Sequence, residues 1–184
     1  MPTRIEAWDE RYRAGEQVLE RPAPLLVEFT SGLTPGTALD LASGPGRNAL
    51  FLAERGWRIT AVDGSATAIE LLRRNNPSID ARLADLETGE FELTPRAFDL
   101  VLSCYYLQRS LIPAMQSALR AGGMLIMIVR LVDTGQPQGT PTRALPGELR
   151  AFFDSWRILH YWEGERGVLD RRHAVAEVVA QKPA

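Results

Sequence analysis

Cysteine and histidine are scarce in this sequence of 184 residues, which holds one cysteine, Cys104, and two histidines. A single cysteine excludes an internal disulfide framework and a cysteine-based zinc cluster. Two histidines supply few further ligands, so we expect no metal site. Neither sign of charge dominates, because 21 Lys and Arg residues face 23 Asp and Glu residues. A basic stripe, which a nucleic-acid-binding protein needs, is missing.

Long apolar runs are missing as well. The longest strongly apolar run, Met124–Val129, is far shorter than the ~20 residues of a membrane-spanning helix. The first residues, MPTRIEAWDERY, are charged and amphipathic and lack the apolar region of a signal peptide. The sequence therefore predicts a cytoplasmic protein without a membrane or nucleic-acid partner, and its length suits one domain.

Helices and strands alternate along the chain. Apolar periodicity and turn residues predict helices at 3–14, 22–29, 47–56, 65–75, 112–121 and 147–154, and strands at 37–42, 57–63, 78–85, 98–104, 124–130, 155–162 and 173–180. Alternation of this kind is typical of a parallel sheet with helices on both faces. We therefore expect a single-domain, Rossmann-like, doubly wound α/β fold with a mostly parallel seven-stranded sheet.

Two segments depart from that alternation. About ten residues separate the last two expected strands, and a parallel crossover needs roughly a dozen or more. The C-terminal strand should therefore be antiparallel. Residues 131–146 contain three prolines and two glycines and no apolar period, which predicts a lid-like loop. The expected domain thus has N-terminal helices (1–36), a core (37–130), this loop, and a C-terminal helix and hairpin (147–184).

A glycine-rich turn follows the first expected strand, in the stretch LDLASGPGRNA from Leu39 to Ala49. Its G-x-G-x-x-A pattern fits the dinucleotide fingerprint, with Asp63 near the ribose-binding position. Two features oppose a pyrophosphate: Asp40 would repel it, and Pro45 offers no N–H group. A cofactor with a ribose and a positive charge but no phosphate fits both features, and S-adenosylmethionine is such a molecule.

Carboxylates stand at the ends of three successive expected strands, at the sheet edge where open α/β sheets bind ligands. We expect Asp40 to hold the ammonium side of the cofactor, directly or through water. Asp63 would chelate the two ribose hydroxyls. Asp85 would accept from the adenine amino group, while the backbone N–H of Leu86 meets a ring nitrogen.

The stretch ALDLASGPGRNALFLAERGWRITAVDGSATAIELL, followed by FDLVLSCYYLQ and LRAGGMLIMIVR, resembles the motifs of class I S-adenosylmethionine-dependent methyltransferases. GRNALFLA and PGELRAFFDSWRILHYWE resemble the tellurite-resistance group within that family. The sequence departs from that group in having Ala42 and Ser43 where Gly-Cys is usual. With the pattern above, the resemblance implies a cofactor site formed by Asp40, Ala42, Gly44, Gly46, Asp63, Gly64, Asp85, Leu86 and Ser103.

The acceptor is predicted to be a small molecule, such as a thiol, an oxyanion or another soft nucleophile, which needs little beyond alignment. No catalytic base stands out, and His160 and His173 are expected on strand surfaces. The candidates on the acceptor side are Tyr12, Arg21, Tyr105, Arg130 and Arg143. An NAD(P)-dependent oxidoreductase and a non-catalytic S-adenosylmethionine-binding protein remain the alternatives.

Overall fold

A computed structural model describes residues 3–16, 21–89, 91–133, 138–168 and 171–184. The chain divides into two compact units, Met1–Glu92 and Leu93–Ala184. Within the described residues, no helix is both long enough and apolar enough to cross a membrane.

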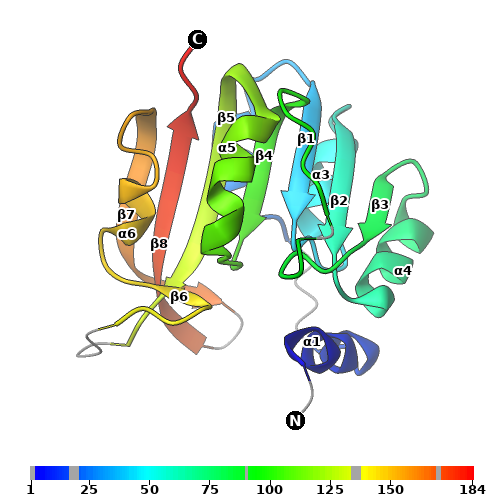
Figure 1. The fold of residues 1–184 in the computed structure, drawn as a ribbon. Coiled ribbons are helices and arrows are strands. Elements are labelled where there is room, and N and C mark those ends of the chain that lie inside the picture. Colours follow the sequence, from blue (N-terminus) through cyan, green and yellow to red (C-terminus); the bar gives the residue numbers. More distant parts are fainter. Residues whose placement is uncertain (1–2, 17–20, 90, 134–137, 169–170) are drawn as a thin grey trace. The chain divides into compact units, whose positions relative to one another are not determined.

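In the first unit, the described residues form three parallel strands in the order β3-β2-β1. These are β1 (Thr37–Leu41), β2 (Arg58–Asp63) and β3 (Asp80–Leu83). Asp40 pairs with Ala61 and Asp63 with Leu83. Because the strands are parallel and in this register, their carboxyl ends meet at one edge, at the lower ends of the arrows in Figure 1.

Four helices lie among the described residues of this unit: α1 (Arg4–Arg13), α2 (Pro24–Thr30), α3 (Arg47–Ala53) and α4 (Ala66–Asn75). Local chemistry fixes where they begin. Thr3 and Glu6 form a capping box at α1, and the Ser65 hydroxyl accepts from the Ala68 N–H to cap α4. The buried faces of α3 and α4 carry Leu52 and Leu72, both fully shielded from solvent.

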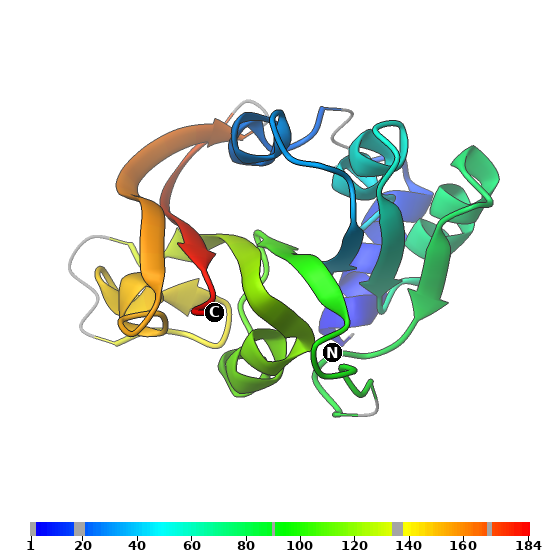
Figure 2. The same cartoon turned by 90° about the horizontal axis from the view of Figure 1, so that it is seen from above.

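The second unit has the strand order β4-β5-β8-β7. Its strands are β4 (Phe98–Cys104), β5 (Leu119–Leu131), β7 (Arg157–Val168) and β8 (Arg171–Gln181), with the two-residue β6 (Arg143–Ala144) beside β5. Its helices are η1 (Arg109–Leu111), α5 (Ile112–Ala118) and α6 (Glu148–Ala151). Figure 2 shows α5 packed along one face of β4 and β5.

The antiparallel C-terminal strand is confirmed, because β8 runs antiparallel to both β5 and β7. The strand bounds behind it were wrong, since β7 and β8 extend far into the segment expected to link them. The link is therefore shorter than expected, which excludes a parallel crossover even more firmly. Gly164 lies in β7 opposite Val175, and the Trp162 ring fills the space beside it. The segment around Gly164 therefore extends β7 at a place where the sequence indicated a turn.

Other predicted boundaries also shift. Helices α3, α5 and α6 end three residues before their predicted ends, and β5 begins at Leu119, before the glycine pair expected to precede it. The loop predicted to lack regular structure contains β6, which pairs Arg130 with Arg143 and Leu131 with Ala144. Part of the predicted lid, residues 134–137, lies outside the described residues.

Candidate cofactor site

The loop between β1 and α3 uses left-handed backbone at three positions, Ala42 (φ 53°), Gly44 (φ 56°) and Gly46 (φ 92°). A Cβ atom on Gly46 would lie 2.3 Å from Cδ1 of Leu72, so any larger residue there would have to displace the buried Leu72 side chain of α4. Ala42 has the same left-handed backbone although it carries a Cβ atom, and this conformation costs about 1–2 kcal/mol. The packing of this unit therefore determines the loop's shape.

Asp63, the last residue of β2, holds that loop in place. Its Oδ2 accepts from the Gly44 N–H at 2.8 Å and its Oδ1 from the Ser65 N–H at 2.8 Å. Burial raises the pKa of Asp63, although the two N–H donors act to lower it. Both carboxylate oxygens thus bind backbone, and a ribose would use their remaining lone pairs.

Asp40 is the most unusual group of the site. Its side chain is 1% exposed, and its Oδ2 is buried without a hydrogen-bond partner among the described residues. Burial raises the pKa of Asp40 to about 7, against the opposing positive charge of Arg47. A buried carboxylate oxygen without a donor is costly. It is also a ready acceptor for an ammonium group.

The turn after β3 carries the third predicted carboxylate. Asp85 accepts from the Glu87 N–H at 2.8 Å through Oδ1, which closes a local turn. Leu86 is 7% exposed, and Glu87 forms an ion pair with Arg4 of α1. Asp85 and Leu86 therefore lie in the turn just after β3, which ends at Leu83 and not at the predicted residue 85.

Helix α1 covers the turns that follow β1 and β2. A Cβ on Gly44 would lie 2.8 Å from the Tyr12 hydroxyl, and one on Gly64 would lie 2.6 Å from Ile5 Cδ1. Burial, and then the negative charge of Asp63, raise the pKa of Tyr12, so its hydroxyl stays protonated. Arg21, by contrast, is exposed, and its carbonyl accepts from Arg47 at 3.2 Å.

The remaining predicted residues lie in the second unit. Ser103 is 1% exposed and donates to the Tyr106 carbonyl at 3.1 Å. Tyr105 has a left-handed backbone (φ 64°) and donates its N–H to Ile128 at 2.6 Å. Arg130 and Arg143 are paired in register on β5 and β6. Strained backbone outside glycine concentrates at functional sites, which draws attention to Tyr105.

Arg143 is engaged through both its side chain and its backbone. Its guanidinium donates to Asp133 at 2.6 Å. Its carbonyl accepts from Arg109 at 3.1 Å, and Arg109 also binds both carboxylate oxygens of Glu148 and the Thr140 carbonyl. The Arg109 side chain therefore holds residues 138–146, the C-terminal part of the segment predicted to be a lid.

Sequence reasoning missed a charged cluster on the C-terminal hairpin. Glu177 is 5% exposed and accepts from Arg166 at 3.0 and 3.1 Å, while His160 lies 3.3 Å away. His160 was expected on a strand surface, yet it contacts this buried carboxylate. The available signal was a lone glutamate in the apolar run AVAEVVA, because buried carboxylates are almost always paired.

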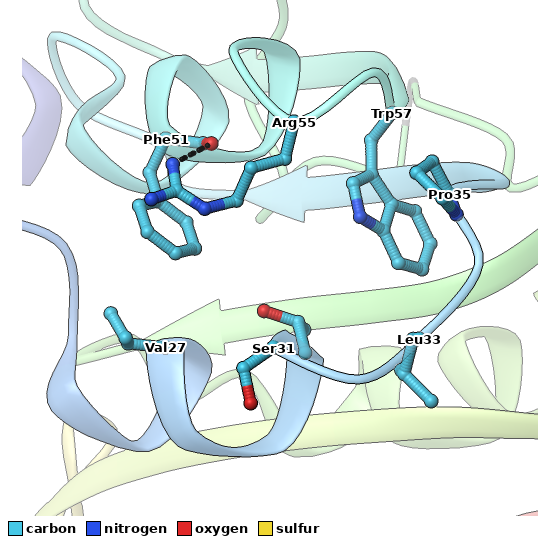
Figure 3. Close-up of a pocket in the computed structure, with 8 residues that line it drawn as sticks. Val27, Ser31, Leu33, Pro35, Phe51, Arg55 and Trp57 are labelled. Atoms are coloured by element: carbon cyan, nitrogen blue, oxygen red, sulfur yellow. Dashed lines mark hydrogen bonds between the residues drawn. The ribbon is translucent and has the colours of Figure 1, made fainter.

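A cavity of about 360 Å³ lies elsewhere in the first unit, between the C-terminal parts of α2 and α3 (Figure 3). Its lining residues are Val27, Thr30, Ser31, Leu33, Pro35, Phe51, Arg55 and Trp57. The Arg55 guanidinium lies 3.7 Å from the Phe51 ring centroid and donates to the Phe51 carbonyl. None of these eight side chains is a carboxylate, so the cavity is not the predicted site. No cluster of three metal-binding side chains occurs in the part of the chain that the structure describes.

Solved structures share this fold. The crystal structure of TehB from Haemophilus influenzae matches with a TM-score of 0.79 and 21% identity, over 95% of this chain and 67% of that chain. A structure named for the conversion of a disulfide bond into a thioacetal group during echinomycin biosynthesis matches with a TM-score of 0.73 and 23% identity, over 98% and 94%. The predicted Rossmann-like methyltransferase fold is confirmed.

The family follows from the sequence itself. The sequence model described as "Tellurite resistance protein TehB" matches residues 18–180, and the chain belongs to the TehB family. A Haemophilus influenzae (strain 10810) protein named "Probable S-adenosyl-L-methionine-dependent methyltransferase TehB" is 24% identical over 151 residues, 75% of this chain and 52% of that protein. The chain thus spans about half the length of the curated relatives it matches.

Proposed function

We propose that this chain transfers the methyl group of S-adenosylmethionine to a small-molecule acceptor. The observation that carries the proposal is the buried Oδ2 of Asp40, which has no hydrogen-bond partner among the described residues, next to a loop that Asp63 holds in place. When bound, the cofactor supplies an electrophilic methyl group on a sulfonium. The protein then has to bind it, orient it and exclude water.

The backbone of the loop favours this cofactor over a dinucleotide. The Ser43 N–H donates to Val62, the Gly44 N–H to Asp63 and the Gly46 N–H to Ser43. Pro45 has no N–H. Each of these four positions therefore lacks the free N–H group that a pyrophosphate requires. The relatives named as methyltransferases likewise speak against the NAD(P)-dependent oxidoreductase alternative.

The residues fit the parts of this cofactor in the predicted order. Asp40 accepts from the ammonium side and Asp63 from the ribose hydroxyls. Asp85 and the Leu86 N–H take the adenine edge, and the turns at Ala42, Gly44, Gly46 and Gly64 line the same strand ends. Ser103 completes the proposed set.

The acceptor proposed is a soft sulfur, selenium or tellurium nucleophile. A thiolate or similar anion attacks a methyl sulfonium without a general base, so the reaction needs alignment above all. The family description refers to tellurite resistance, and a structural relative is named for disulfide-to-thioacetal conversion, which supports this class. We assign acceptor recognition to Tyr12, Arg21, Tyr105, Arg130 and Arg143, with small molecules as the only proposed partners.

Two measurements test the proposal. Calorimetry with S-adenosylmethionine, S-adenosylhomocysteine and NADH should show binding of the first two only. Incubation with a panel of thiols, chalcogen oxyanions and phenols should release S-adenosylhomocysteine with at least one soft acceptor. Binding of NADH without S-adenosylhomocysteine would refute the cofactor, and binding without turnover on the whole panel would favour a non-catalytic binding protein.

A further inference from the structure

Helix α1 lies beyond the carboxyl ends of β1 and β2 in the first unit (Figure 1). Its residues Ile5, Asp9 and Tyr12 are spaced to lie on one helical face. Ile5 contacts the turn at Gly64, and Tyr12 contacts the loop at Gly44. Both turns belong to the proposed cofactor site, so α1 closes over the groups that would hold the cofactor.

One side chain fixes this helix to the first turn of α4. Asp9 Oδ1 accepts from the Ser65 hydroxyl at 2.6 Å and from the Thr67 N–H at 2.9 Å. The hydrogen bond from Ser65, followed by that from Thr67, lowers the pKa of Asp9. The carboxylate is therefore ionised at neutral pH, and its hydrogen bonds are of the stronger, charge-assisted kind.

The rest of the attachment is weak. None of the residues of α1 is fully buried. Arg4 of α1 forms an ion pair with Glu87, and both side chains are partly exposed. Elements with few buried apolar contacts open at low free-energy cost. By contrast, Asp40 and Asp63 are 1% and 9% exposed. Both carboxylates are therefore largely shielded from solvent, and α1 contacts the turns beside them at Gly44 and Gly64.

We propose that α1 is the gate of the cofactor site and that Asp9 is the latch that holds the gate shut. Cofactor enters and leaves when the contacts of Asp9 with Ser65 and Thr67 break, and the closed helix retains bound cofactor. Asp9 is thus a positioning residue that sets the rate of cofactor exchange. This inference rests on the proposed function, because it assumes that the site holds S-adenosylmethionine.

The rate test uses S-adenosylhomocysteine as the probe and surface plasmon resonance on the full chain. Asp9→Ala removes both hydrogen bonds and should speed dissociation at least about tenfold. Asp9→Asn keeps an acceptor oxygen without the charge and should fall between Asp9→Ala and the parent. Glu10→Ala, on an exposed position of the same helix, and Arg13→Ala, which removes the ion pair to Asp9, should leave the rate unchanged.

A second measurement reports directly on the hydrogen bonds made by Asp9. The Thr67 amide donates to Asp9, so its hydrogen exchange, measured by NMR, reports opening of the gate. It should exchange faster in Asp9→Ala than in the parent, and more slowly in the parent once S-adenosylhomocysteine is bound. A merely structural role in capping α4 would not link this amide to the cofactor.

The outcomes separate the two proposals. Parental dissociation rates in Asp9→Ala would overturn the latch, and so would equal acceleration by Glu10→Ala. Faster Thr67 exchange on adding S-adenosylhomocysteine would mean that the cofactor displaces α1, which would overturn the gate. A parent protein that binds no S-adenosylhomocysteine would refute the proposed function instead.

Discussion

Replacing Asp40 by asparagine should change how stability depends on pH. The side chains are nearly the same size, but only the aspartate can ionise. Asp40 has a pKa of about 7 in the folded protein, against an ordinary value of 3.8. The folded state therefore holds this proton more tightly than the unfolded state. The contribution of Asp40 to stability is full below about pH 4 and is lost as pH rises towards 7.

The difference between these pKa values sets the size of the effect. At about 1.4 kcal/mol per pKa unit, the ionised carboxylate destabilises the ligand-free protein by roughly 4 kcal/mol above neutral pH. About 2–3 kcal/mol of that cost should develop between about pH 5 and about pH 8. The parent should lose this much stability relative to Asp40→Asn across that interval.

Urea unfolding of both proteins at the two pH values measures the difference. The pH dependence is the informative quantity, because the asparagine amide carries a constant cost of its own in this buried site. Glu10→Gln, which replaces an exposed acid of α1, is the matched control and should follow the parent. Identical pH profiles for parent and Asp40→Asn would refute the reasoning about the buried proton.

Three further predictions follow from the site. Gly46→Ala should destabilise the protein by about 2 kcal/mol or more in urea unfolding, because the new Cβ meets Leu72 at a left-handed backbone. Asp63→Ala should weaken S-adenosylhomocysteine binding about tenfold or more in calorimetry, and it should also raise hydrogen exchange at Gly44, whose N–H it frees; parental affinity would contradict the ribose assignment. Arg143→Ala should raise KM for anionic acceptors and spare neutral ones in turnover assays, and equal effects on both would remove the proposed charge recognition.

The positions of the three carboxylates proposed for the site could be predicted from the sequence because they depend on where the strands end. Asp40, Asp63 and Asp85 each come at or just after the end of a segment predicted as a strand, and parallel pairing brings the ends of such strands to one edge. The allocation of hydrogen bonds could not be predicted. Both oxygens of Asp63 bind backbone of its own unit, which depends on the conformation of two turns and not on residue type.

Contacts between distant segments at two of the glycines could not be predicted from the sequence either. Gly44 and Gly64 were predicted at the site, but a Cβ atom there would meet Tyr12 and Ile5 of α1. That contact joins segments far apart in the chain, and no local pattern reports it. Strand β6 was not predicted for another reason, because two residues are too few to show the apolar–polar alternation of a strand.

The cluster around Glu177 also determines how the C-terminal hairpin can pair. Side chains alternate between the two faces of a strand, so a one-residue slip of β7 along β8 would turn Arg166 and His160 away from Glu177. The buried carboxylate would then lose its cation, a change that typically costs several kcal/mol. The native register, in which Glu177 lies opposite Trp162, keeps the three side chains together. The ion cluster therefore stabilises one register of β7 and β8 relative to the others. Hairpins that form in another register during folding are less stable.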